Sequence, residues 1–511
     1  MRRNWKKFAA VFAVAAFTLS AASCTGLTLA SNAEASETGR TDIHLRMADA
    51  FSTLDPHNTA MNSDFLLNRQ IYEPLYALND ASEEIPMLAT EYTVSDDGLT
   101  WTFKLRDGVT FQNGNPLKAS DVVYSYERAM ASSYMAEKTE AIESVNAVDD
   151  STVELHLKYQ FAPLVEKISE IMIVNEEYTE ANKDDQGLLG FNACGTGAYQ
   201  VTSAVPDVSV SLESYEDYWG GAPAIKSATY ELITDDTTAI TSFEAGEIDM
   251  MGIPSANWEE ISTDDTYNSQ AIDANHVTYL ILNTQAAPFD NLQVRQAISY
   301  AINRQDVIDM SVDGLASAAD TLATSYMFGY TENHTSFDYD VEKAKELLSE
   351  AGYADGLDIG SIKVLSGTYF EKVAQVVQGE LAEIGVTCTI EGMDGNSLIA
   401  DCMGGNIGMS VMGQTNGMDY DFMKTYYGTD YIDSLNMARY SNEEVDKLFD
   451  EGASTTDKDA RLDIYKQIEE IVQNDCAYVP LYNRQTLYAW NKDLNYTPSV
   501  TYYHLKDITW N

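Results

Sequence analysis

The side chains that most often catalyse reactions occur in this chain, but their spacing matches none of the common catalytic motifs. The run 408–413 (GMSVMG) is one residue too long for the GxSxG turn of a serine hydrolase. Neither the zinc motif HExxH nor the phosphate-binding motif GxxxxGKS/T is present. Six histidines occur, and no two of them lie within four residues of each other: His44, His57, His156, His276, His334 and His504. We therefore expect a protein that is not an enzyme.

Acidic residues are abundant, but they do not form a recognisable metal site. The chain has 80 Asp and Glu against 31 Lys and Arg, a net charge of −49. Such a surface repels phosphate backbones and anionic lipid, which excludes nucleic acid as a partner. The acidic stretch 235–249 lacks the order of a calcium loop, and no CxxC pair suggests zinc. We expect no cofactor; a secreted hydrolase with an unrecognised carboxylate pair is a remote alternative.

The N-terminus has the composition of an export signal. Four basic residues precede an apolar run at 8–22, which is short for a membrane-spanning helix. The sequence Ala21-Ala22-Ser23-Cys24 resembles a lipobox, in which Cys24 would be lipidated, whereas Ala33-Glu34-Ala35 offers a competing cleavage site. We assign 1–35 to a signal peptide and tether. The mature protein is then a cell-membrane lipoprotein or a periplasmic protein, in either case extracytoplasmic.

Four cysteines follow the signal region, namely Cys194, Cys388, Cys402 and Cys476. An exported protein can join two of them, and Cys388–Cys402 is the first choice. Four unpaired, buried thiols are the alternative.

Short strand patterns alternate with amphipathic helix patterns, which predicts an α/β fold with central sheets. The expected strands are 100–105, 151–158, 277–283, 362–365, 387–390, 409–412 and 478–481. The expected helices are 122–130, capped by Ser120 or Asp121, then 292–308, 341–351, 370–384, 397–403, 442–451 and 457–473. With 45% apolar and 22% charged residues, the composition is that of a globular protein.

Several motifs occur in the order found in one known family. They are Leu54-Asp55-Pro56-His57, the run 70–75 (QIYEPL), the run 94–111 (VSDDGLTWTFKLRDGVTF), Gly195-Thr196-Gly197-Ala198-Tyr199, Pro288-Phe289-Asp290-Asn291 and the run 301–304 (AINR). In this order the chain resembles the extracytoplasmic solute-binding proteins of family 5, the peptide and nickel binders of ATP-driven importers. The motifs set turns and buried faces, so they identify the fold rather than the ligand.

The resemblance implies a type II periplasmic-binding-protein-like fold, with two hinged lobes and an extra domain inserted in lobe one. Lobe one would comprise 36–65, 196–275 and 487–511, the inserted domain 66–195, and lobe two 276–486. The hinges would lie near 276–279 and 485–488. The implied function is that of a substrate-binding protein, a monomer that captures peptides between closing lobes. It would deliver them to an ABC permease in the cytoplasmic membrane.

The resemblance also places the ligand site after a lobe-two strand, where relatives bind the peptide ammonium through an Asp. Asp419 is the first candidate here and Asp421 its rival, although either could instead cap a helix. The neighbouring site residues would be Gln414, Asn416 and Tyr420, with Tyr482 and Arg484 near the second hinge. The loop 366–369 lacks the arginine of dipeptide binders, which favours oligopeptides. An oligosaccharide or a nickel chelate is the alternative ligand.

Overall fold

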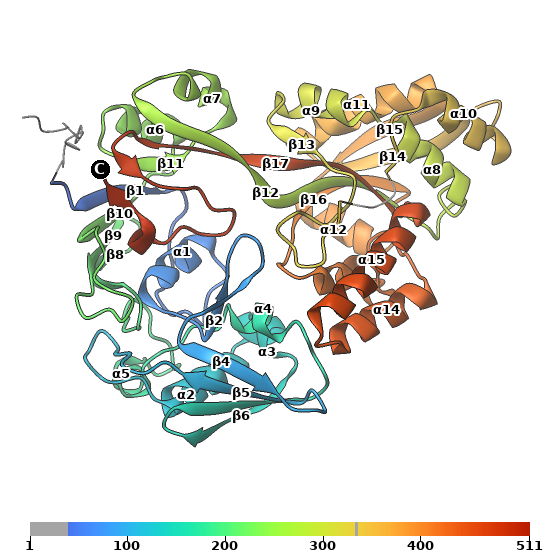
Figure 1. Ribbon diagram of the computed structural model, residues 1–511. Helices are drawn as coiled ribbons and strands as arrows, with labels where there is room; N and C mark the ends of the chain where they lie inside the picture. Colours follow the sequence, from blue (N-terminus) through green and yellow to red (C-terminus); the bar gives the residue numbers. More distant parts are fainter. Residues whose placement is uncertain (1–38, 333–335) are drawn as a thin grey trace, which may run out of the picture. The chain divides into compact units, whose positions relative to one another are not determined.

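The computed structural model describes residues 39–332 and 336–511 (Figure 1). The predicted signal peptide, with its expected lipidation site at Cys24 and the competing cleavage site at Ala35, and His334 lie outside these residues. The α/β fold that the sequence predicts is confirmed, with one large mixed sheet and helices against it. Within the described part of the chain, no helix combines the length and the apolar character that crossing a membrane requires.

The large sheet has 11 strands. In spatial order these are β15 (Val386–Met393), β14 (Leu357–Leu365), β16 (Met409–Thr415), β12 (Tyr267–Leu282), β17 (Tyr478–Asn491), β11 (Met250–Gly252), β1 (Asp42–Met47), β10 (Ser227–Leu232), β9 (Ser209–Ser214) and β8 (Tyr199–Val205), with β13 (Ala316–Ala318) beside β17.

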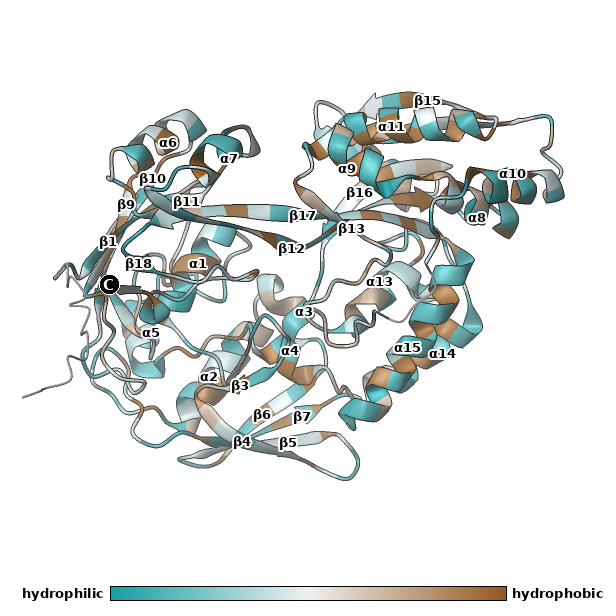
Figure 2. Ribbon diagram, turned by 45° about the horizontal axis from the view of Figure 1, so that its top comes forward, coloured by the Kyte–Doolittle hydropathy of each residue, from teal (hydrophilic) through white to brown (hydrophobic). Residues whose placement is uncertain are grey.

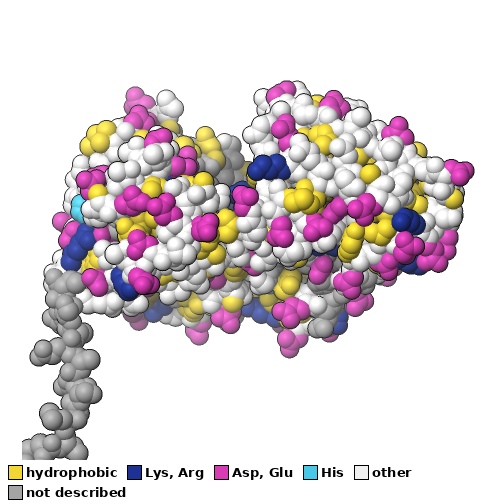
Figure 3. All heavy atoms as spheres, turned by 90° about the horizontal axis from the view of Figure 1, so that it is seen from above, with side chains coloured by type: hydrophobic (Ala, Val, Ile, Leu, Met, Phe, Trp, Pro, Cys, Tyr) yellow, Lys and Arg dark blue, Asp and Glu magenta, His cyan; other side chains and the backbone are white. Residues whose placement is uncertain are grey.

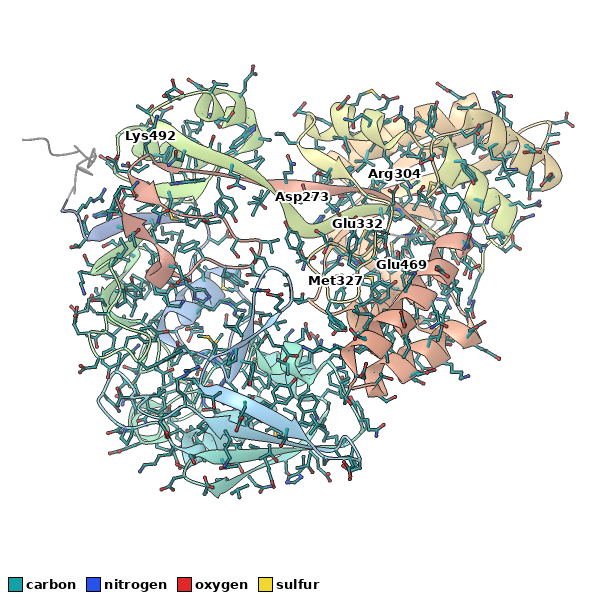
Figure 4. All side chains as sticks on the ribbon, viewed as in Figure 1. Asp273, Arg304, Met327, Glu332, Glu469 and Lys492 are labelled. Carbon is teal, nitrogen blue, oxygen red and sulfur yellow. The ribbon has the colours of Figure 1, made fainter. Side chains whose placement is uncertain are left out.

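The two longest strands, β12 and β17, pair antiparallel from Tyr267↔Asn491 to Ile281↔Tyr478. They run side by side between α6 and α7 at one end and α9 and α11 at the other (Figure 1). A register shift interrupts their pairing between Asp273 and Val277, and Asp273 lies midway along β12 (Figure 4). Both predicted hinge segments belong to these strands, and their hinge role stays a prediction.

A second sheet of four strands lies in the first half of the chain. Its strands are β4 (Ala89–Val94), β5 (Thr100–Leu105), β7 (Thr152–Leu157) and β6 (Ile142–Asp149). The strand predicted at 100–105 is confirmed as β5, whose alternation buries Trp101 and Phe103. Two small hairpins pair β2 (Tyr76–Leu78) with β3 (Glu84–Pro86), and β18 (Leu494–Asn495) with β19 (Thr509–Trp510).

The helices of the first half are α1 (Asn62–Ile71), α2 (Ala119–Met130), α3 (Ala136–Thr139), α4 (Leu164–Ile168), α5 (Glu176–Asn182), α6 (Asp236–Glu244) and α7 (Ser255–Ser262). Those of the second half are α8 (Leu292–Ala301), α9 (Arg304–Val312), α10 (Val341–Glu350), α11 (Tyr369–Glu383), α12 (Gly395–Met403), α13 (Lys424–Tyr427), α14 (Glu443–Ser454) and α15 (Lys458–Asp475). Short 3-10 turns are η1 (Ser133–Met135), η2 (Tyr420–Met423), η3 (Thr429–Tyr431) and η4 (Leu505–Asp507).

Strand β12 is buried on both faces at its C-terminal end. Leu280 and Leu282 pack into a core with α8 and α11, whereas Tyr279 and Ile281 pack into a second core with α14 and α15. This double burial explains why 277–282 reads as an almost continuous apolar run. The helices that cover the sheet carry polar and apolar residues on different sides (Figure 2).

Two predictions about helices were wrong. The helix expected over 292–308 is two helices, because Ile302 leaves the helical conformation and the Asn303 side chain accepts a hydrogen bond from the Gln305 N–H to begin α9. Helix α2 begins after Lys118, so neither Ser120 nor Asp121 is its N-cap. Asp121 lies in the first turn, where its carboxylate accepts from the Lys118 N–H at 3.0 Å.

The Cys388–Cys402 disulfide is also wrong, since all four described cysteines are free. Cys388 on β15 packs against the core that contains α8 and α11. Cys402 on α12 is buried in the core of α14 and α15, on the other face of the sheet. The two thiols therefore face away from each other.

The predicted domain limits, 36–65, 66–195, 196–275, 276–486 and 487–511, stay a prediction. Each hydrophobic core draws on its own set of residues along the chain. One core draws on residues between Leu75 and Cys194, and two others on residues between Val277 and Tyr482. Another joins Ile43–Tyr72 to residues near 198–250 and to the C-terminal segment around Leu505.

Candidate ligand-binding cavity

A cavity of about 980 Å³ is lined by segments that are far apart in the sequence. They are α1, the β2–β3 hairpin, α4 with the residues after it, Asn275 of β12, the loop 415–418 after β16, and the C-terminal segment 495–508. This volume is at the upper end of the range for small-molecule sites, about 300–1,000 Å³. The cavity is therefore large enough for an extended ligand.

A charged pair lies on one wall of the cavity. Arg69 of α1 donates to Glu170 at 2.6 Å, and its guanidinium stacks on the Tyr502 ring at 4.5 Å from the centroid. Burial disfavours the ionised form of Glu170, but Arg69 and Lys138 outweigh it and hold the pKa of this carboxyl below its usual value. The wall thus presents an ionised carboxylate beside a guanidinium.

Glu73 forms a second polar centre in the same cavity. Its carboxylate accepts hydrogen bonds from Tyr218 Oη at 2.6 Å, Trp219 Nε1 at 2.7 Å and Thr196 Oγ1 at 2.9 Å. Burial raises the pKa of Glu73 in spite of these three donors. Because its lone pairs are used within the protein, Glu73 acts as a scaffold for this wall.

The Gly195-Thr196-Gly197 motif supports that scaffold. A Cβ on Gly195 would lie 2.0 Å from the Ile71 carbonyl oxygen, and one on Gly197 would lie 2.7 Å from it. Only glycine permits this close approach of the two backbones. The motif therefore has a structural role.

Another part of the wall contains amide groups from β12 and from the segment that follows β16. Asn275 Nδ2 donates to the Asn416 carbonyl oxygen at 3.0 Å, and Asn416 Nδ2 donates to the Leu322 carbonyl oxygen at 2.9 Å. Gln414 is buried behind Asn416 and donates to its side-chain oxygen at 2.6 Å. Asn416 alone among the sequence-predicted site residues lines the cavity.

Asp419 lines a small pocket that adjoins the large cavity, since both are lined by Leu78, Glu166 and Met418, and its carboxylate receives three protein donors. Arg461 lies 3.0 Å from Oδ2, and Oδ1 accepts from Tyr465 Oη at 3.0 Å and from the Asp421 N–H at 3.0 Å. The last of these bonds makes Asp419 the N-cap of η2, which is the alternative role that the sequence left open. An ammonium ligand would have to compete with Arg461 for this carboxylate.

The Asp421 carboxylate is less completely hydrogen-bonded than that of Asp419. Burial, followed by the charge of Asp419, raises the pKa of Asp421 to about 7, while Lys167 and Lys424 oppose the shift. Its buried Oδ1 has no hydrogen-bond partner among the described residues. Asp421 does not belong to the residues that line the large cavity.

The three remaining predicted residues have other surroundings. Tyr420 is buried and donates to Glu469, which lies on α15 (Figure 4). Tyr482 is fully buried in the core beside α8 and α11, and Arg484 stacks on Tyr369 at 4.8 Å from the centroid. The structure brings none of them to the wall of the cavity.

Sequence reasoning missed the charged residues of the cavity. Arg69 and Glu170 are 101 positions apart, and both are more than 300 positions from Tyr502. No short motif links them, and acidic side chains are spread over the surface (Figure 3), so single glutamates carried no signal. Basic residues are scarce in this chain, and this scarcity was the one feature of the sequence that could have drawn attention to Arg69.

The fold and the cavity together define a two-lobed solute-binding protein. Residues 83–446 match the family described as bacterial extracellular solute-binding proteins, family 5, and the chain belongs to this family. It is thus the extracytoplasmic substrate-binding component of an ABC transporter, and its relatives are binding proteins rather than enzymes.

Named relatives differ in what they bind. The chain is 28% identical to heme-binding protein A of Haemophilus influenzae, over 81% of this chain and 82% of the relative. It is 28% identical to the glutathione-binding protein GsiB of Salmonella typhimurium, over 89% and 91%. Among solved structures, DppA of Helicobacter pylori in complex with the peptide STSA is 26% identical, with a TM-score of 0.70 and coverage of 92% and 98%.

Proposed function

We propose that this protein captures peptides, chiefly oligopeptides, in the large cavity and delivers them to an ABC permease. The observation that carries the proposal is the composition of the cavity wall. It combines an Arg69–Glu170 pair, the amides of Asn275 and Asn416, and aromatic side chains within about 980 Å³. A peptide offers charged ends, backbone donors and acceptors, and side chains of varied polarity, and each meets a matching group here.

Two relatives support this ligand class. The DppA structure contains a peptide, and GsiB is named for glutathione, which is itself a tripeptide with a free amino group. The loop 366–369, which carries no arginine, is consistent with ligands longer than a dipeptide.

We propose a revised set of ligand contacts. Asn416 remains a contact, supported by Asn275, and Arg69 and Glu170 are added to it. Asp419 is proposed as a structural residue because its donors are all within the protein. Gln414 is placed behind the site as support for Asn416.

Ligand binding would favour closure because a ligand that touches both 66–195 and 276–486 makes contacts that the open form lacks. The closed form would then dock on the permease. We also propose that Cys24 is lipidated and tethers the monomeric protein to the membrane, so that Cys24→Ala would release it into the soluble extracytoplasmic fraction.

Heme is a second candidate, favoured by one feature of the wall. Six aromatic side chains line the cavity together with His504: Phe65, Tyr72, Tyr218, Tyr496, Tyr502 and Tyr503. Burial, together with Lys506 and Arg69, lowers the pKa of His504 to about 4, so its imidazole is neutral and able to bind iron.

A thermal-shift screen of the processed protein tests both candidates. It would compare randomised tetrapeptides, the same peptides N-acetylated, oligosaccharides, nickel chelates and hemin. We expect an upward shift in melting temperature with free-amine tetrapeptides and none with oligosaccharides or chelates. A shift with hemin alone would replace the peptide proposal by heme binding, and a shift with sugars or chelates alone would refute both.

A further inference from the structure

We propose that Glu166 binds the ammonium group of the peptide, at the place where its carboxylate meets the backbone of Gly417. The inference rests on the proposed peptide function and specifies which carboxylate binds the amino terminus of the peptide. Glu166 belongs to α4, within 66–195, whereas Gly417 follows β16, within 276–486. Both residues line the large cavity.

The absence of a side chain at Gly417 is what allows this approach. A Cβ at this position would lie 3.3 Å from Glu166 Oε1 and 3.2 Å from Phe422 Cβ. Gly417 has no positive φ, so the backbone does not itself require glycine here. A side chain at this position would therefore crowd both the Glu166 carboxylate and Phe422.

The charge of Glu166 is only partly neutralised by the protein. Lys167 Nζ lies 3.2 Å from Glu166 Oε2, but it also lies 3.0 Å from Glu137 Oε1. Lys167 is in addition a cationic neighbour of Asp421, and Lys424, the other such neighbour, is bound to Asp450 at 2.7 Å. One ammonium is thus shared among several carboxylates, which leaves attraction for a further cation.

A backbone oxygen beside Gly417 adds a second acceptor for an ammonium. The Asn416 carbonyl accepts one hydrogen bond, from Asn275 at 3.0 Å, whereas the Met418 carbonyl already accepts two, from Ser82 Oγ at 2.8 Å and from the Phe328 N–H at 2.8 Å. An ammonium has three N–H donors, and the second lone pair of the Asn416 carbonyl can accept from one of them. The Glu166 carboxylate and the Asn416 carbonyl therefore both offer acceptors to a peptide amino terminus.

The two carboxylates differ in their partners and in their access to the large cavity. The Asp419 carboxylate already receives Arg461, Tyr465 and the Asp421 N–H. Glu166 faces the large cavity with 12% of its side chain exposed. A ligand ammonium held there touches segments from both 66–195 and 276–486, which links recognition of the amino terminus to closure.

Equilibrium dialysis of the processed protein tests the inference, with randomised tetrapeptides and their N-acetylated forms as probes. We expect the wild type to retain free-amine peptides, and Glu166→Gln to weaken their binding by about 30-fold or more while binding acetylated peptides as before. Gly417→Ala should displace the carboxylate and reduce the same preference. Glu137→Gln is the matched control, since it removes a charge from the same lysine outside the cavity, and it should keep the wild-type preference.

The inference is overturned if folded Glu166→Gln protein keeps the wild-type preference for free amines, a result that leaves the peptide function standing. It is also overturned if the wild type binds acetylated and free peptides equally. If the wild type binds neither form, the proposed function fails, and this inference fails with it.

Discussion

Replacing Asp419 by alanine should destabilise the protein, because it leaves the Arg461 guanidinium buried without its counterion. The two side chains are 6% and 7% exposed and form an ion pair at 3.0 Å. Removing one partner of a buried pair costs about 3–5 kcal/mol. An unfolding entropy of about 2 cal/mol/K per residue gives a total unfolding entropy of about 1 kcal/mol/K for a protein of this length. The loss of free energy therefore corresponds to a fall in melting temperature of about 3–5 °C.

A double-mutant cycle measures this coupling. We expect Asp419→Ala and Arg461→Met each to destabilise the protein, and the double variant to be more stable than Asp419→Ala alone because no unpaired charge remains. Calorimetry of the four proteins at neutral pH supplies the free energies.

The opposite pattern would refute the structural role of Asp419. If Asp419→Ala melts at the wild-type temperature but loses its binding of free-amine peptides, the carboxylate is the ammonium ligand that the sequence motif suggests. Peptide binding by the folded variant at near wild-type affinity is the result that we expect.

Two further predictions concern stability. His504 has a pKa of about 4 in the folded protein and about 6.5 when unfolded, so the unfolded state binds more protons between these pH values. The free energy of unfolding should therefore fall by about 1–3 kcal/mol as the pH drops from 6.5 to 4. Denaturant titrations at several pH values should show a smaller fall for His504→Asn. Gly195→Ala should lower the free energy of unfolding by about 1–3 kcal/mol or prevent folding, because its Cβ would lie 2.0 Å from the Ile71 carbonyl oxygen. Gly221→Ala is the control, since its Cβ would meet open space and the variant carries only the cost of a positive φ. Equal losses of stability in the two variants would contradict the steric argument.

Much of the fold could be predicted from the sequence because the signals are local. The period-two alternation at 100–105 gave β5 with its bounds, and the helical spacing of 341–351 gave α10 to within one residue. The break between α8 and α9 was missed because Ile302 continues the apolar spacing. What ends α8 is the preference of Asn303 for a cap, and that preference competes with the helical pattern.

The site was harder to predict because its residues meet only in the folded chain. Asn416 was found because it follows a strand within a recognisable loop. Glu166 and Arg69 were missed, as each is brought to the cavity by tertiary packing. Asp419 has the residue type of an ammonium ligand, but the sequence could not show that Arg461, 42 positions away, would occupy it.

A crystal structure of the processed protein grown with randomised tetrapeptides tests the central claim most directly. We expect density for an extended peptide in the cavity between Arg69 and Asn416, with its amino terminus at Glu166. Density in another place, or an empty cavity in a protein that does bind hemin, would contradict the claim that this protein is a peptide receptor.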